Sequence, residues 1–141
     1  MKNHRALALA GFATVCAVAL SGCSVDSLIW GNDGAQVIRT TENLIKDLAP
    51  GGTSALICED AEADLGTAKD WEGRSAGEPE RFVADYWDEQ VPLEPQWNIN
   101  LEGLPEGATP GDKHPGDVFY RETDDGLCVI DVAWSTLITV G

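Results

Sequence analysis

Basic residues are scarce in this sequence. Lys and Arg number nine against 24 Asp and Glu in 141 residues, which gives a formal charge of −15. Proteins that bind nucleic acid neutralise phosphates with clustered basic side chains, so a chain this acidic is not expected to bind nucleic acid. The same charge repels anionic lipid headgroups, so a folded domain of this composition should stand off a membrane surface. The ligand classes left open are a basic protein, a cation and a small molecule.

Histidine and cysteine are also few. The chain has two histidines, His4 and His114, and four cysteines at positions 16, 23, 58 and 128. These residues show none of the paired spacings that hold zinc. We therefore expect no metal site, and nothing else in the sequence predicts a cofactor.

The N-terminal apolar run is too short to cross a membrane. Residues 6–20 are mostly Ala, Leu and Val, whereas a spanning helix needs about 20 apolar residues. The run follows a short basic segment, residues 1–5, and ends at the small residues Ser21 and Gly22. This order of basic, apolar and small residues is typical of a secretory signal.

The end of this segment carries a more specific pattern. Leu20-Ser21-Gly22-Cys23 resembles the lipobox of bacterial lipoproteins. The resemblance implies diacylglycerol on the Cys23 thiol, cleavage between Gly22 and Cys23, and a new amino group open to acylation. Stable membrane anchoring requires at least two acyl chains, and a diacylglycerol supplies two. We expect a protein held to the extracytoplasmic face of the cell membrane through Cys23; the alternative is an ordinary secretory signal with Cys23 as a structural thiol.

Cleavage at this point defines the mature chain. Removal of residues 1–22 from the 141 leaves 119, enough for one domain, and seven basic against 24 acidic residues, a formal charge of −17. We expect residues 23–32 to be a lipid-anchored tether and residues 33–141 to form one extracytoplasmic domain. Cys58 and Cys128 are then the two cysteines left in a compartment where disulfides persist, so we expect them to pair.

Hydrophobic periodicity predicts both helices and strands. Apolar residues at helical spacing predict a helix over 34–49, with Asp33 as its N-cap and Pro50 as its stop. A second helix is predicted from Pro79, with its apolar face formed by Phe82, Val83, Tyr86 and Trp87. Strands are predicted over 96–102, 117–122 and 127–140, with a long loop over 103–116 and a hairpin turn at 124–126. Residues 53–58 fit a strand or a helical turn, and residues 59–77 a loop or loose helix.

This order of elements predicts an α+β fold. One or two N-terminal helices should pack on a curved antiparallel sheet of three or more strands. The element order over residues 33–138, with a cysteine after the first helix and another on a late strand, resembles small bacterial lipoproteins of the nuclear-transport-factor-like cone fold.

One serine motif suggests catalysis. Gly73–Gly77 fits G-x-S-x-G around Ser75, and Asp112 and His114 follow in the chain order of an α/β-hydrolase triad. The motif requires a buried strand before the serine and a large parallel sheet. Residues 69–72 do not form such a strand, and His114 lies in a Gly- and Pro-rich loop. We therefore expect Ser75 to cap a helix, with Glu78 at capping-box spacing, rather than to act as a nucleophile.

Two acidic patterns offer other chemistry. Residues 60–66 alternate carboxylates as a calcium loop does, but Trp71 occupies the position that needs a bidentate Glu. Asp85, Asp88 and Glu89 lie beside Trp87, where paired carboxylates would suit glycoside chemistry. Four tryptophans are candidates for a sugar platform, although Trp97 and Trp134 fit the core better: Trp71, Trp87, Trp97 and Trp134.

No catalytic constellation is complete in the sequence. We therefore expect a membrane-anchored, non-enzymatic binding or interaction module whose ligand is not specified. The alternatives are a small surface hydrolase that uses carboxylates and a calcium-dependent module.

The lipid anchor yields the first testable prediction. Cys23→Ser removes the thiol that would carry diacylglycerol, so the variant should stay uncut or be secreted freely. Partitioning in Triton X-114 should place the natural protein in the detergent phase and any processed variant in the aqueous phase. A processed Cys23→Ser protein in the detergent phase would contradict the prediction.

Overall fold

The computed structural model describes the backbone of residues 23–139 and the side chains of residues 25–139. The predicted signal, residues 1–22, and the side chain of Cys23 lie outside the described residues. In chain order the helices and strands are α1 (Cys23–Leu48), α2 (Ala68–Trp71), β1 (Ser75–Arg81), the 3₁₀ turns η1 (Ala84–Tyr86) and η2 (Val91–Leu93), β2 (Trp97–Glu102), β3 (Lys113–Thr123) and β4 (Gly126–Thr136). None of the helices within residues 23–139 has the length and hydropathy of a membrane span.

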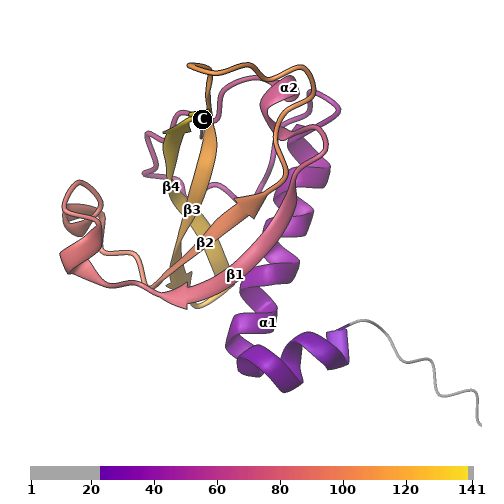
Figure 1. Cartoon of the computed structure of the whole chain (residues 1–141). Coiled ribbons are helices and arrows are strands. Elements are labelled where there is room, and N and C mark those ends of the chain that lie inside the picture. Colours follow the sequence, from indigo (N-terminus) through magenta and orange to yellow (C-terminus); the bar gives the residue numbers. More distant parts are fainter. Residues whose placement is uncertain (1–22, 140–141) are drawn as a thin grey trace, which may run out of the picture.

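The sheet is a four-stranded antiparallel meander in the order β1-β2-β3-β4. Thr123 pairs with Gly126 across the predicted hairpin turn, and Gly126 has the positive φ of 118° that such a turn favours in glycine. The register shifts once in the β1–β2 pairing and twice in the β3–β4 pairing. Such irregularities bend strands, and the sheet curves across α1 without closing (Figure 1). The predicted α+β class is confirmed.

The predicted helix over 34–49 is confirmed as the longer part of α1. Its buried apolar side chains pack on the inner face of the sheet: Val37, Ile38, Leu44 and Leu48. Thr41, fully buried among them, donates its hydroxyl proton to the Val37 carbonyl (2.8 Å). Its oxygen is therefore left to accept from the Tyr120 hydroxyl of β3 (2.7 Å), and burial raises the pKa of Tyr120. This bond satisfies both hydroxyls inside the core.

The segment predicted to be a tether is helical. α1 begins at Cys23 and kinks at Gly31, whose φ of 73° and ψ of 175° are essentially restricted to glycine. The carboxylate of Asp33, the predicted N-cap, accepts a bond from Arg81 of β1 (3.2 Å). Figure 1 shows the turns before the kink bending away from the sheet.

The outer face of the sheet is covered by two irregular segments, residues 58–67 and 82–96. Phe119 and Ile130 are the buried apolar residues of the sheet on this side. Phe82 and Trp87 meet the Phe119 ring edge-on, with centroids 6.1 and 4.9 Å away. The predicted Cys58–Cys128 disulfide is present and holds the start of the first segment to β4.

Three predictions about residues 75–116 are wrong. Residues 75–81 form β1, with Pro79 buried in this edge strand, so no helix begins at Pro79; of the predicted second helix, only Ala84–Tyr86 forms a 3₁₀ turn. Ser75 therefore caps no helix; the capping box belongs to Thr67 and Asp70 at α2. The long loop is also shorter than predicted, because β3 begins at Lys113.

The disulfide yields a stability prediction. It closes 70 residues, and in the chain-entropy model its removal by Cys58→Ala with Cys128→Ala should lower the free energy of unfolding by roughly 4 kcal/mol. Urea denaturation of the two proteins measures the difference. Intact mass under non-reducing conditions should be lower than that of the reduced protein by two hydrogen atoms. Equal midpoints, or free thiols in the oxidised native protein, would contradict the prediction.

Candidate functional site

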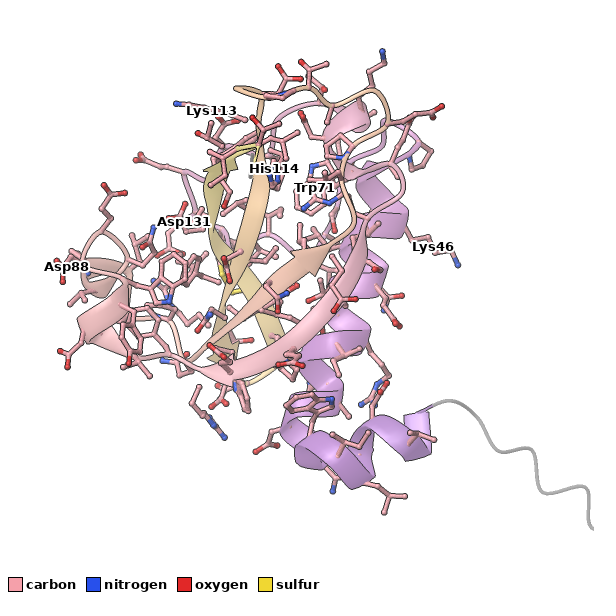
Figure 2. All side chains as sticks on the ribbon, in the orientation of Figure 1. Lys46, Trp71, Asp88, Lys113, His114 and Asp131 are labelled. Carbon is pink, nitrogen blue, oxygen red and sulfur yellow. A yellow bond between two sulfur atoms is a disulfide. The ribbon has the colours of Figure 1, made fainter. Side chains whose placement is uncertain are left out.

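An open groove of about 760 Å³, which we call the acidic groove, lies between the two segments that cover the outer face of the sheet. Glu62 and Asp64 line one wall, residues 86–90 line the other, and residues 131–134 of β4 form the floor. Figure 2 shows Asp131 on β4 facing the side on which the wall residue Asp88 lies. The groove therefore brings together three parts of the chain that are far apart in sequence.

The floor of the acidic groove follows the edge of β4. Four successive residues, 131–134, line it. Because successive side chains of a strand point to opposite faces, the groove runs along the edge of β4 and not over one face of the sheet. β4 is an edge strand, and residues 56–58 bond to it only at Val129, through Leu56 and Cys58 (2.7 and 2.9 Å). In the described chain no backbone hydrogen bond joins β4 to residues 59–67 beyond that point. The strand edge is thus open to the groove.

Side-chain hydrogen bonds fix both walls to β4. Gln90 is buried, and its Nε2 donates to Oδ2 of Asp131 (2.9 Å). On the other side, the indole N–H of Trp134 donates to the Asp64 carbonyl (3.0 Å). With Trp87 seated on Phe119, these contacts give the acidic groove a preformed shape.

Arg121 of β3 joins the two walls at one end. Its Nη1 donates to both carboxylate oxygens of Asp60 (3.0 and 3.1 Å), and its Nη2 donates to the Leu93 carbonyl (2.7 Å). The guanidinium hydrogen bond lowers the pKa of Asp60. One cation therefore ties the first covering segment to the second.

The lining of the acidic groove has one sign of charge. It contains no Lys, Arg or His and carries five carboxylates: Glu62, Asp64, Asp88, Glu89 and Asp131. Three aromatic side chains share the lining, with Tyr86 exposed and two tryptophans half-buried: Tyr86, Trp87 and Trp134. Carboxylates attract a cation, and an aromatic face also binds one.

The sequence had identified part of this lining. Asp88, Glu89 and Trp87 lie in the groove as one cluster, whereas Asp85 does not line it. Of the tryptophans, Trp71 and Trp97 are buried in the core, and Trp134, which was predicted to be in the core, packs half-buried against it and also lines the groove. The sequence did not identify seven other lining residues as members of one site, because no local pattern links them: Glu62, Asp64, Tyr86, Gln90, Asp131, Val132 and Ala133.

The structure does not assemble the suspected serine triad. His114 and Asp112 line a hollow near α2 that does not include Ser75, which is an exposed first residue of β1 (Figure 2 shows His114). The Asp112 carboxylate accepts two bonds from Thr109 (2.8 and 3.0 Å). His114 lies on β3, not in a loop as predicted, and its Nδ1 is 3.2 Å from the Pro115 carbonyl. The three residues thus lack the mutual contacts of a triad.

Two carboxylates of the suspected calcium loop are bound to other groups of the chain. Asp60 binds Arg121, and Asp64 accepts a bond from the backbone N–H of Gly66 (2.9 Å). Within the residues that the structure describes, no three His, Cys, Asp or Glu side chains are grouped to hold a metal ion.

One carboxyl outside the groove has a pKa that its surroundings raise. Burial raises the pKa of Asp117 on β3, the nearby Glu80 raises it further, and a hydrogen bond from Asn98 lowers it. Asp117 does not line the acidic groove. Its desolvation is therefore a matter of stability rather than of a binding cleft.

Asp117→Asn should stabilise the protein at neutral pH. The folded-state pKa of Asp117 lies above its ordinary value of 3.8. At pH values between these two pKa values, folding takes up a proton, so the stability of the fold falls as the pH rises. The amide carries no charge to desolvate. Thermal unfolding from pH 7 to pH 3 should show a higher Tm for the variant at pH 7 and a difference that vanishes in acid. A less stable variant at pH 7 would refute the assignment.

No protein-family model, curated protein or solved structure matches this chain. The resemblance to cone-fold lipoproteins therefore stays a prediction. The function has to be argued from the geometry and charge of the acidic groove.

Proposed function

We propose that this protein is a lipid-anchored, extracytoplasmic binding module, and that its acidic groove binds an extended, basic segment of a partner protein. The observation that carries the proposal is the lining of the groove. Five carboxylates and three aromatic side chains surround an open strand edge, with no basic residue among them.

The charge of the lining favours a cationic ligand. Two of the carboxylates are on one wall, two on the other and one on the floor, so a Lys or Arg side chain meets a carboxylate on every side. Tyr86 and Trp87 add aromatic faces, over which a guanidinium or ammonium group is stabilised by about 0.5–1 kcal/mol at an exposed site. Charge attraction and the cation–π contact therefore act together on a Lys or Arg side chain, whose cation is carried on an apolar stem.

The open edge of β4 favours a peptide among cationic ligands. An extended chain can add to a sheet edge through main-chain hydrogen bonds, while its alternate side chains enter flanking pockets. The four floor residues 131–134 match roughly four residues of an extended peptide. The walls are fixed before binding, which reduces the ordering cost.

The proposed anchor suits the same function. Lipid on Cys23 would hold the domain at the membrane, and a mature charge of −17 keeps its surface away from anionic headgroups. The acidic groove then stays accessible to a partner in the same compartment.

Neutralising two wall carboxylates should weaken peptide binding. Asp88→Asn with Glu89→Gln removes two charges, each worth about 0.5 kcal/mol at an exposed position, so the Kd for a fluorescent peptide of alternating Lys and Val should rise about fivefold. Fluorescence polarisation at low and physiological ionic strength measures this, and the difference should shrink as salt rises.

Asp124→Asn with Asp125→Asn is the matched control, because it removes the same charge at the exposed hairpin turn of β3 and β4. The control should bind like the natural protein. Equal weakening by both pairs would show that net charge alone attracts the peptide, and would overturn the groove as its site.

A further inference from the structure

The start of α1 presents an apolar face to solvent. Val25, Leu28 and Ile29 are 57%, 87% and 64% exposed, and their spacing places them on one side of the helix. Trp30 is 37% exposed and, by its helical position, lies on the other side of this helix, against Gly34. Asp26 is the one charged residue among residues 23–32. An exposed apolar cluster of this kind marks a surface that another apolar phase covers.

We propose that this face, formed by Val25, Leu28 and Ile29, lies in the headgroup region of the membrane that holds Cys23. The inference rests on the proposed lipid anchor. Cys23 and Leu28 belong to the same helix, and a rise of 1.5 Å per residue puts them about 8 Å apart along its axis. Interfacial helices sink roughly 5–10 Å into the boundary between headgroups and acyl chains. A helix that begins at the lipid-bearing residue is therefore within reach of that layer.

The distribution of charge supports a lipid surface as the occupant. Seven basic and 23 acidic residues lie after residue 32, so nearly all of the negative charge belongs to the part beyond the kink. The helix before the kink carries a single acid, so it can touch lipid while the acidic domain stands off.

The kink itself holds these two parts at an angle. Gly31 has a conformation essentially limited to glycine. Trp30 lies against Gly34, where a Cβ would come within 2.7 Å of the Trp30 Cβ. Figure 1 shows the result: the helix before Gly31 points away from the sheet that carries the acidic groove. A membrane contact at residues 25–29 thus leaves the groove facing the aqueous compartment.

Quenching by brominated lipid tests the contact directly. The full-length, processed protein is reconstituted in neutral phosphatidylcholine vesicles with bromine on the acyl chains, which quenches only tryptophans at membrane depth. A Leu28→Trp variant places a reporter at the centre of the face, and its total emission should be quenched more strongly than that of the natural protein. Co-flotation with the vesicles is recorded separately and reports the anchor.

A variant pair confirms which surface is responsible. In the Leu28→Trp protein, Val25→Glu with Ile29→Glu should abolish the added quenching, whereas Ile138→Glu, which adds charge at another exposed apolar residue, should leave it unchanged. A Leu28→Trp protein that co-floats without added quenching overturns the proposed contact but not the anchor. A dimer of the natural protein in detergent, lost when Val25 and Ile29 are replaced by Glu, would show that a second copy covers the face, and would also overturn it. Failure to co-float overturns the anchor itself.

Discussion

A four-stranded sheet has two faces to cover, and the described chain has one long helix with which to cover them. α1 buries the inner face and forms the larger core with β2, β3 and β4. The outer face is left to the irregular segments 58–67 and 82–96. Irregular segments need specific attachments, since they have no regular backbone pairing of their own. Here the attachments are the Cys58–Cys128 disulfide, the packing of Phe82 and Trp87 on Phe119, and the bonds of Arg121.

The acidic groove follows from this way of covering the sheet. Arg121 draws the two segments together at Asp60 and Leu93, but along β4 they separate and leave the strand edge between them. Segments on the surface carry polar residues, and in a chain with this excess of Asp and Glu the polar residues are mostly acidic. The shape of the groove thus comes from the attachments, and its charge from the composition.

α1 serves two environments because Gly31 divides it. After the kink, residues such as Val37 and Leu44 are fully buried against the sheet. Before the kink, Leu28 and Ile29 are as apolar as Val37 and Leu44, but they are exposed. A continuous helix would carry both faces along one axis, whereas the kink lets each part take its own direction. In the function proposed, the first part meets lipid and the second holds the domain that binds the partner.

The sequence by itself determined the elements whose signal is local. The 3.6-residue period around Val37 and Leu44 specified the longer part of α1, alternation specified β2, and elimination among four cysteines specified the disulfide. Tertiary structure decided the rest. Residues 75–81, predicted as the end of a loop and the start of a helix at Pro79, became β1 because β2 offered them a pairing edge. The sequence identified Trp87, Asp88 and Glu89 as one cluster but not the groove around them. Asp64 and Trp134 meet across 70 residues, and only folding determines which loop carboxylates face one another.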